Sequence, residues 1–465
     1  FDHEIMRLLQ QLGLADGALD YARPAPAYEF RAADGKPLLR FDLPAQSPSA
    51  WSTGYMFNQP GMENALRGLL ADLPEAEVRL ERRFVALSQD ADGVTAELEG
   101  PNGAEQVRAR YLVGCDGASS PVRQAIGGAL SDYQFDEPWL VVDARILPGA
   151  RTPDINLQIC DPKRPTTCVL MGPGRHRWEF MLLPGEEPER MLDEALVQSL
   201  IAPWDCGPVE LERKAVYRFH GLVADRWRDG RVLLAGDSAH QTPPFAGQGM
   251  CSGLRDAANL AWKLGAVLDG AADEALLDTY QTEREPHVRA LIEFAIGMGR
   301  VVCALDPQVA AERDRSMLAQ RAAGAPALRP TAPAPLTVGV VIPGAPLAGT
   351  LCPQLLIDGQ RSDDVFGDGP WLISRAAIET DHPPLKAISA KASRFAPFAE
   401  GLLDLLGLAP GAALLVRPDR YVFGAGAPET LVTAYVRAVA RPAAPPSLAT
   451  DSGVIGEVQG QMAEH

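Results

Sequence analysis

The sequence predicts a mixed α/β (α+β) fold, and three observations support this class. A strand, a glycine-rich turn and a long helix follow one another between residues 231 and 264. A second strand runs into a turn and a helix between residues 107 and 123. Residues 139–217, between these units, alternate short apolar runs with turn residues, which is typical of antiparallel strands. We therefore expect a layer of βα units that is interrupted by an antiparallel sheet.

The first unit has the features of a site for an anionic ligand. Its apolar strand ends at Gly236 and Asp237, and its helix begins near Met250. Gly247 and Gly249 would let the backbone approach a ring or a phosphate, while the helix start directs N–H groups and a positive dipole end at the ligand. Asp237 is placed to accept hydrogen bonds from ligand hydroxyls. An ordinary βα turn explains the Gly-Asp pair alone, but the whole stretch indicates a binding site.

The second unit has a similar construction. Its strand ends at Asp116 and Gly117, and Ser120 and Pro121 are suited to the cap and the first turn of a helix that carries Arg123. Taken alone, this segment fits a capped helix with a surface ion pair as well as it fits a site. The presence of both units favours a shared site.

Composition excludes several classes of protein. The chain has 465 residues, enough for two or three domains, and a formal net charge of −17, which argues against a nucleic-acid partner. No apolar run reaches the roughly 18 residues needed to span a membrane. The seven cysteines include no C-x-x-C pair, so we expect reduced thiols and neither a disulfide framework nor a metal site. With no signal peptide in the sequence as given, we expect a cytoplasmic protein.

Several stretches resemble one enzyme family. The segment R-V-L-L-A-G-D-S-A-H-Q-T-P-P-F-A-G-Q-G-M, from residue 231, resembles the second flavin-binding motif of the class A FAD-dependent aromatic hydroxylases, the family of para-hydroxybenzoate hydroxylase. The Asp-Gly unit resembles another motif of this family. D-P-K-R-P (161–165), R-H-R-W-E-F-M-L-L-P-G-E (175–186) and L-V-R-P-D-R-Y-V (415–422) resemble its 3-(3-hydroxyphenyl)propionate/3-hydroxycinnamate hydroxylases.

The resemblance implies roles for individual residues. Asp237 would hold the ribityl chain of FAD, Pro244 would line the isoalloxazine ring, and the backbone of Gly249 and Met250 would face the pyrimidine end. The full set expected to bind the cofactor is Gln59, Asp116, Gly117, Arg123, Gly236, Asp237, Pro244, Gly247, Gly249 and Met250.

Three further assignments depend on the same resemblance. Asp116 and Arg123 would touch FAD and the path of NADH or NADPH. Gln59 precedes a helical pattern and is a weaker candidate, because a lone glutamine there has many explanations. Arg175 and Arg177 are candidates for binding a substrate carboxylate by a bidentate pair, although a solvated strand face explains them better.

The family's activity is the reaction that we expect here. NADH or NADPH would reduce FAD, and a flavin hydroperoxide formed with dioxygen would hydroxylate a phenolic ring next to its hydroxyl. The short motifs favour 3-(3-hydroxyphenyl)propionate or 3-hydroxycinnamate, and another phenol or a resorcinol stays open. The sequence names no catalytic base, and we interpret His240 as structural. A flavin-dependent halogenase is disfavoured, because the chain has no W-x-W-x-I-P run.

One expected motif is missing. A Rossmann-type flavoprotein should open with a strand, G-x-G-x-x-G and a helix, whereas this chain starts at Phe1 in a helical pattern. We expect that about 45 residues of a first βαβ unit precede it. The alternative is an inactive fragment that cannot retain FAD.

The patterns divide the chain into five ranges. We expect a Rossmann-like FAD-binding domain at 1–130 and 215–320, a β-sheet substrate domain at 131–214, a Pro/Ala-rich linker at 321–335, a thioredoxin-like domain at 336–441 and a disordered tail at 442–465. Without a C-x-x-C pair, the thioredoxin-like domain should be structural or form a homodimer. Within the first range we expect a helix at 1–12 and strands at 78–80, 85–87, 94–98 and 107–113.

Overall fold

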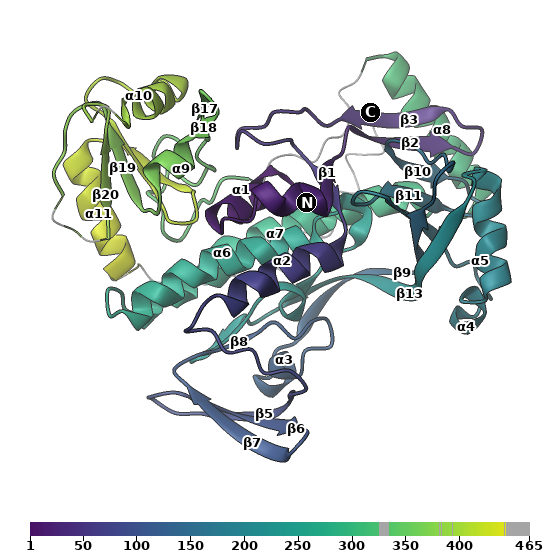
Figure 1. Ribbon diagram of the computed structural model, residues 1–465, viewed down its shortest axis with the longest axis horizontal. Coiled ribbons are helices and arrows are strands. Elements are labelled where there is room, and N and C mark those ends of the chain that lie inside the picture. The colour runs from purple at the N-terminus through teal and green to yellow at the C-terminus, as the bar shows by residue number, and fades with distance from the viewer. Residues whose placement is uncertain (325–333, 381, 383, 393, 441, 443–465) are drawn as a thin grey trace.

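The computed structural model describes residues 1–324, 334–380, 382, 384–392, 394–440 and 442 (Figure 1). Residues 325–333 of the predicted linker and 443–465 of the predicted tail lie outside the described residues. Within the described part, no helix combines the length and the apolar character needed to cross a bilayer.

The largest sheet has eight strands in the order β16-β13-β9-β12-β11-β10-β2-β3. Their bounds are β2 Ala27–Ala32, β3 Pro37–Asp42, β9 Leu130–Ile146, β10 Asn156–Cys160, β11 Thr166–Leu170, β12 Arg175–Met181, β13 Val209–Ala224 and β16 His240–Gln241. The antiparallel strands expected within residues 139–217 are confirmed as β9, β10, β11, β12 and β13. The sheet is wider than the expected range 131–214, because β2 and β3 join it from the start of the chain and β2 pairs in parallel with β10.

Helices cover both faces of this sheet (Figure 1). On one face, Leu140, Trp178 and Phe180 pack with residues of α5 (Glu194–Ile201) and the short α4 (Pro188–Met191). On the other face, Phe135 and Trp139 belong to a core that includes residues of α7 (Asp278–Val302) and α8 (Pro307–Ala322). Because successive strand residues point to opposite faces, the two sets separate by alternation along β9 and β12.

The two predicted βα units lie side by side. β15 (Val232–Leu234) pairs in parallel with β8 (Leu112–Gly114), and β14 (Arg228–Asp229) completes a three-stranded sheet. The ladder continues where the backbone N–H of Ala235 donates to the carbonyl of Gly114. Parallel strands end at the same edge, so the turns that follow them meet.

Two predicted strands in the first range were wrong. The expected strand at 107–113 is two strands, because β7 (Gly103–Ala109) pairs in a separate antiparallel sheet with β6 (Val94–Gly100), which in turn pairs with β5 (Arg83–Gln89). Residues 78–80 form no strand in the described structure. Val78 and Leu80 are 60% and 69% exposed, so their apolar pattern is not used in a ladder.

Long helices run through the centre of the molecule (Figure 1). α6 (Gly249–Leu268) contacts α7 and α1. α1 spans His3–Gln11, which confirms the helix predicted at 1–12. Asp2 caps α1, because its carboxylate accepts from the N–H groups of Glu4 and Ile5. α2 (Gln59–Ala71) follows the small pair β1 (Ala22–Pro24) and β4 (Tyr55–Phe57), and α3 (Pro121–Ala125) is capped by Ser120.

Residues 336–440 contain a second sheet with its own core. Its order is β20-β19-β21-β22, in which β19 and β20 are parallel and the other pairs are antiparallel. The bounds in this region are β17 Leu356–Ile357, β18 Gln360–Arg361, α9 Ser362–Phe366, β19 Trp371–Ser374, β20 Lys386–Ser389, α10 Ala396–Leu405, β21 Ala413–Val416, β22 Val422–Gly426 and α11 Pro428–Ala440. Phe366, Trp371 and Phe398 form its centre.

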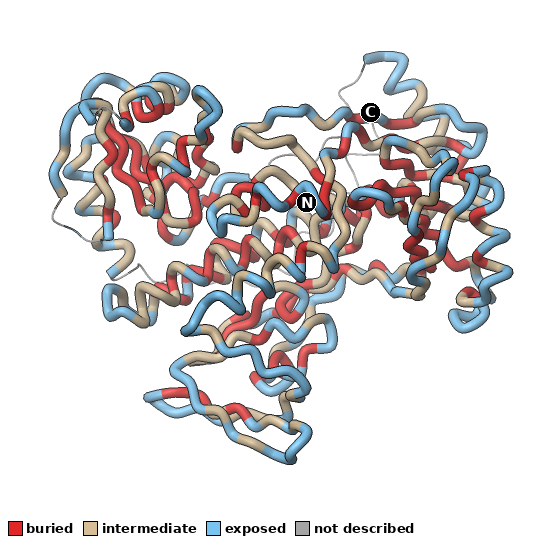
Figure 2. The backbone as a smooth tube through the Cα atoms, viewed as in Figure 1, coloured by how far each residue is buried: buried red, intermediate tan, exposed pale blue. Residues whose placement is uncertain are grey.

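A buried charge network fixes this C-terminal sheet to α6 and α7. Glu283 of α7 accepts from Lys263 of α6 at 2.8 Å and from Arg417 at 2.7 Å, and all three side chains are fully buried. Asp419 also pairs with Arg417 at 2.7 Å. Figure 2 shows buried residues along both helices beside this region. Each buried charge needs its partner, so these ion pairs hold the C-terminal sheet against α6 and α7.

Candidate functional site

Two loops predicted to bind the cofactor are joined by hydrogen bonds. The Ser238 hydroxyl donates to Oδ1 of Asp116 at 3.0 Å and accepts from the Gly117 N–H at 3.3 Å. Arg123 donates to the carbonyls of Ser238 and Ala118, each at 2.8 Å. Arg123 is only 5% exposed, and its guanidinium is used to hold the two loops together. The structure therefore brings Asp116, Gly117 and Arg123 beside the loop that begins at residue 236.

Asp237 projects from this junction toward solvent. It lies in the short 3₁₀ segment η3 (Gly236–Ser238), directly after β15. Its side chain is exposed, and no hydrogen bond to it comes from the described residues. A carboxylate with free lone pairs at the end of a parallel strand is suited to accept from ligand hydroxyls.

A buried network supports the Gly236 turn from below. Asp256 of α6 accepts from His240 Nε2 at 2.6 Å, from Arg284 Nε at 2.9 Å and from the Gly236 N–H at 3.1 Å. Burial alone would raise the pKa of Asp256, but His240 and Arg284 outweigh burial and lower it. The Tyr280 hydroxyl donates to the carbonyl of Leu234 at 3.0 Å. This geometry supports a structural role for His240.

Glycines let the Gly236 turn and α6 approach each other. Gly236 has φ 62°, a conformation that favours glycine, and a Cβ on Gly253 would lie 3.3 Å from the Gly236 Cα. α6 begins at Gly249, and the residue before it, Gln248, provides no side-chain cap. Gly247 has φ 63° and open space around it. The first N–H groups of a 20-residue helix are thus left for a ligand beside Asp237.

The loop that carries Pro244 is held by an aromatic wedge. Pro244 begins the 3₁₀ segment η4 (Pro244–Ala246), and the buried Phe245 ring lies 5.6 Å from Trp139 and 5.8 Å from Phe135 between centroids. A Cβ on Gly299 of α7 would lie 2.8 Å from the rings of both Phe135 and Phe245. Phe245 therefore fixes the loop that carries Pro244 between the eight-stranded sheet and α7.

Gln59 has a less direct position. It is the first residue of α2, it is exposed, and its amide donates to Glu63 of the same helix at 2.9 Å. Met62 and Leu66 of α2 pack in one core with Met250 of α6. Gln59 is consequently one turn from the residues that contact the start of α6, and no hydrogen bond joins it to either loop within the described structure.

The two candidate arginines are already paired with protein carboxylates. Arg175 Nε lies 2.8 Å from Glu212, and Arg177 makes a bidentate pair with Asp143 at 2.6 and 3.0 Å. Both lie on β12, facing the same side of the sheet as Trp139. A substrate carboxylate would have to compete with these partners.

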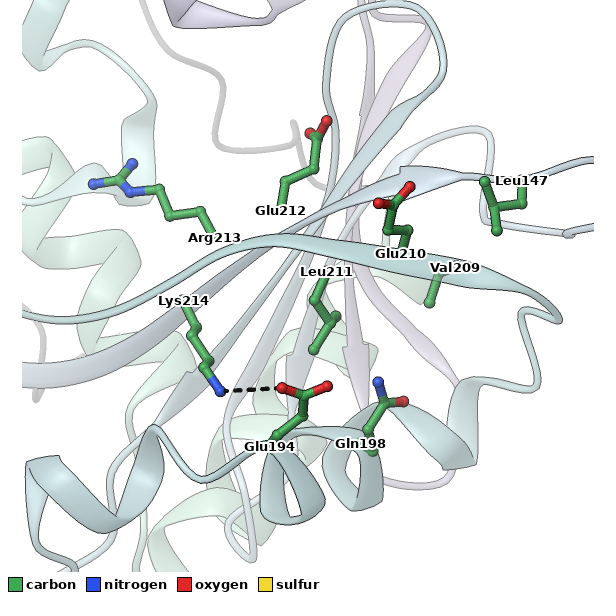
Figure 3. Close-up of a pocket in the computed structure, with 9 residues that line it drawn as sticks. All are labelled: Leu147, Glu194, Gln198, Val209, Glu210, Leu211, Glu212, Arg213 and Lys214. Atoms are coloured by element: carbon green, nitrogen blue, oxygen red, sulfur yellow. Dashed lines mark ion pairs between the residues drawn. The ribbon is translucent and has the colours of Figure 1, made fainter.

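A separate hollow of about 520 Å³ contains none of the predicted residues (Figure 3). It lies between β13 and α5 and is lined by Leu147, Glu194, Gln198, Val209, Glu210, Leu211, Glu212, Arg213 and Lys214. Lys214 and Glu194 face each other across it at 3.7 Å. This open, mixed-charge surface has no feature of a flavin site.

Sequence reasoning missed Ser238, Asp256 and Arg284. Ser238 directly follows Asp237, and a small polar residue at the end of a buried strand is a signal that could have been used. Asp256 and Arg284 lie on two different helices, and no local pattern predicts that their side chains meet beneath the turn.

Comparisons with known proteins identify the family of the chain. The family described as FAD binding domain matches residues 1–295. The chain is 37% identical over 485 residues to a probable NADH-specific resorcinol 4-hydroxylase of Rhodococcus jostii (strain RHA1), with 96% of this chain and 89% of the relative covered. It is 38% identical over 317 residues to a 3-(3-hydroxy-phenyl)propionate/3-hydroxycinnamic acid hydroxylase of Mycolicibacterium smegmatis, with 68% of this chain but only 56% of the relative covered.

Solved structures share the fold. The ternary complex of aklavinone-11 hydroxylase with FAD and aklavinone has a TM-score of 0.74 at 24% identity and covers 94% of this chain and 90% of its own. The flavin-dependent monooxygenase PieE has a TM-score of 0.75 at 21% identity, with 94% and 91% covered. The chain therefore shares the fold of these two proteins. The chain belongs to the FAD-binding-domain family of flavin-dependent aromatic hydroxylases, and the resemblance found in the sequence is confirmed.

Proposed function

We propose that this protein hydroxylates a phenolic ring next to an existing hydroxyl, using FAD, dioxygen and NADH or NADPH, in the breakdown of aromatic compounds. One oxygen atom enters the ring, and the other leaves as water with two electrons from the nicotinamide. The observation that carries this proposal is the junction of the Asp116 and Asp237 loops beside the uncapped start of α6. Family membership supports the same reaction class.

The residues present fit FAD. Asp237 would accept from the ribityl hydroxyls, and Pro244 would lie against the ring. Backbone N–H groups at Gly249 and Met250 would stabilise negative charge at the pyrimidine end. Gly247 adds no side chain before the start of α6, and Gly236 and Gly253 let the turn and the helix approach each other. When bound, FAD supplies the redox chemistry that activates dioxygen.

The remaining candidates would support this cofactor indirectly. Asp116, Gly117 and Arg123 would keep the two loops in register, since they bond to each other and to Ser238. Gln59 would reach the cofactor only after leaving Glu63. The eight-stranded sheet would shield the reacting atoms from water, because its face toward α7 is apolar near Trp139.

The ring substrate has two candidate classes. The short motifs favour 3-(3-hydroxyphenyl)propionate or 3-hydroxycinnamate, whose carboxylate needs a cationic partner. A neutral resorcinol needs none, and the pairing of Arg175 and Arg177 with Glu212 and Asp143 fits this second class better. The alignment with the resorcinol hydroxylase also spans more of the chain. We therefore favour a neutral phenol of the resorcinol type.

The C-terminal region is proposed to be thioredoxin-like and non-redox. Its sheet order and strand directions fit that fold, although the described residues between β19 and β20 form no helix, where that fold has its first one. Cys352 is the one cysteine that the sequence holds between residues 336 and 441, and it is buried. The region would therefore brace α6 and α7 or take part in a homodimer.

The test of this function begins with the absorption spectrum of the purified chain, before and after FAD is added and the mixture is desalted. Retained flavin bands are expected. NADH and NADPH oxidation would then be followed with resorcinol, 3-(3-hydroxyphenyl)propionate and 3-hydroxycinnamate, and products identified by mass. Ring hydroxylation of any of these supports the proposal. A chain that retains no flavin, or that oxidises nicotinamide without hydroxylating any phenol, would overturn it.

A further inference from the structure

A polar stripe crosses the face of the eight-stranded sheet that carries Trp139. Paired residues of neighbouring strands face the same side of a sheet. Glu179 of β12, Thr167 of β11 and Gln158 of β10 therefore form one row on this face, which ends at Phe30 of β2. Two residues along, Arg177 lies opposite Asp143, and Asn156 lies opposite Tyr28. Polar side chains buried between a sheet and a helical layer need hydrogen-bond partners.

Glu179 is the member of this stripe without a hydrogen-bond donor. It is 9% exposed, and no donor from the described residues bonds to its carboxylate. The nearest cation is Arg177, whose Nη1 lies 3.8 Å away and whose two hydrogen bonds go to Asp143. A buried carboxylate without donors is unfavourable unless a ligand supplies them. Its oxygens are therefore free to accept a ligand hydroxyl.

The position of Glu179 relative to the proposed flavin site follows from strand register. Met181 lies opposite Trp139, and Trp139 contacts Phe245 of the loop that carries Pro244. Glu179 is two residues before Met181 and faces the same side, about 7 Å further along the strand. Glu179 thus faces the side of the sheet on which Trp139 contacts the Pro244 loop.

A second side chain on the same face has one polar atom without a partner among the described residues. Asn156 is fully buried, its Oδ1 accepts from the Leu170 N–H at 2.9 Å, and its Nδ2 has no hydrogen-bond partner among the described residues. β10 and β12 are separated by β11, so Asn156 and Glu179 stand on strands about 10 Å apart. Both groups therefore face the same side of the sheet, two strands apart.

We propose that Glu179 is the group that draws the proton from the substrate's phenol, and that the substrate is a neutral dihydroxybenzene whose second hydroxyl accepts from Asn156 Nδ2. This inference rests on the proposed function and names its substrate class and its catalytic base. The carboxylate accepts the reacting hydroxyl, while the Asn156 donor fixes the ring's orientation. The sequence interpretation left this base unassigned, because a glutamate in the strand R-H-R-W-E-F-M reads as one more charged residue.

The proton transfer balances on this chain's own residue. The phenol O–H bond breaks, the proton moves to a Glu179 oxygen, and the electron pair stays on the phenol oxygen, which enriches the ring carbon beside it. After the hydroxyl is inserted at that carbon, the carbon loses its hydrogen as a proton and the ring recovers aromaticity. Glu179 then returns its proton to the original oxygen and is ionised again.

The charges around Glu179 define the pH dependence. Burial raises the pKa of Glu179, Arg177 opposes this rise and Asp143 adds to it. Tyr28 of β2 stands on the same face, where burial and the Glu179 charge both raise the Tyr28 pKa, and Arg213 of β13 lies 3.9 Å from Asp143. Since only the ionised carboxylate can take the proton, both phenol binding and hydroxylation should weaken as the pH falls through this raised pKa.

The experiment compares Glu179→Gln and Glu179→Asp with wild type, and uses Glu210→Gln as the matched control, the same change at an exposed position of β13 in the same sheet. The FAD-loaded proteins are titrated with resorcinol by calorimetry between pH 5 and 8, and hydroxylation is measured over the same range. E179Q should lose roughly 100- to 10,000-fold in hydroxylation rate and the pH dependence of resorcinol binding. E179D should keep part of both, and E210Q should match wild type.

The outcomes separate this inference from the function on which it rests. If E179Q binds resorcinol with the wild-type pH dependence and hydroxylates it at the wild-type rate, the assignment of Glu179 is wrong while the hydroxylase function stands. If wild type hydroxylates only the carboxylated phenols, the proposed substrate class is wrong. If E179Q does not fold, E179D and the wild-type pH profile decide, because an unchanged E179D or a pH-independent affinity for resorcinol contradicts the proposal.

Discussion

The hydroxyl of Ser238 lies 3.0 Å from Oδ1 of Asp116, a residue 122 positions earlier in the sequence. The same hydroxyl accepts from Gly117, so one side chain holds both turns that follow the parallel strands β8 and β15. The segment between these two residues, which includes five of the eight strands of the large sheet, starts and ends at this contact. The proposed cofactor site thus depends on a contact between the two ends of that segment.

Ser238→Ala should loosen this contact. The substitution removes two hydrogen bonds but leaves Asp116 with those from Ser120 and Val122, so we expect about 1–2 kcal/mol less stability and weaker retention of FAD. Urea unfolding and FAD titration measure the two effects. Ser199→Ala is the control, because that exposed hydroxyl donates only within its own helix. Equal behaviour of the two variants would contradict the role given to Ser238.

Asp237→Ala should affect the cofactor and not the fold. Its exposed carboxylate has no hydrogen bond from the described residues, so unfolding without FAD should match wild type. Loss of charged hydrogen bonds to the ribityl chain should weaken FAD binding about 10- to 100-fold. Quenching of flavin fluorescence gives the dissociation constant. Asp269→Ala, at the opposite end of α6, should leave that constant unchanged.

Two glycines of α6 provide a matched pair. Gly265 has no atom within 4 Å of an added Cβ, so Gly265→Ala should stabilise the helix by about 0.5–1 kcal/mol. The same change at Gly253 places a Cβ 3.3 Å from Gly236 and should push the turn away from its position. We expect G253A to bind FAD more weakly and G265A to bind it normally. Normal FAD affinity in G253A would show that the close approach is dispensable.

The ion pairs of Glu283 should make the free energy of unfolding decrease at acidic pH. Burial alone would raise the pKa of Glu283, but Arg417 and Lys263 outweigh it and hold the pKa below the ordinary value of 4.5. The contribution is therefore complete above pH 4.5 and is lost as the pH falls below it. Glu283→Gln leaves buried charges without their partner and should cost about 3 kcal/mol at pH 7.

Urea unfolding of E283Q and wild type at pH 7 and pH 4 tests this expectation. The difference between the two proteins should shrink at the lower pH, because wild type loses stability that the variant no longer has. Glu400→Gln, at an exposed position of α10, is the control and should follow wild type at both values. A difference that stays constant with pH would assign the effect to packing and not to charge.

Local pattern explains which parts of the fold were predictable. The two βα units and the strands of β10, β11 and β12 follow from apolar runs and turn residues that are close in sequence. The membership of β2 and β3 in the large sheet does not, because β2 finds its partner β10 more than a hundred residues away. Residues 78–80 carry an apolar alternation, yet a strand forms only where a neighbour completes its hydrogen bonds.

The residues of the candidate site also divide into those that the sequence predicts and those that it does not. Asp116, Gly236 and Asp237 follow strand ends, a position that the sequence reveals, and the structure brings their loops together. Asp256 and Glu179 could not be predicted, because their importance depends on what faces them from other elements. A charged residue within an apolar strand is equally common on a solvated face, and only burial without a donor distinguishes Glu179.

The recruitment of β2 and β3 into the large sheet limits how this protein can be re-engineered or recombined. A chimaera that exchanged residues 131–214 with a relative would transplant β10 without β2, the strand beside it. It would also cut β13, because residues 215–224 of that strand lie outside the exchanged range. The sheet that would face the substrate ring therefore cannot be exchanged as one continuous segment. Changes of substrate preference in such a framework are expected to come from single side chains facing the ring, with the strands that carry them retained.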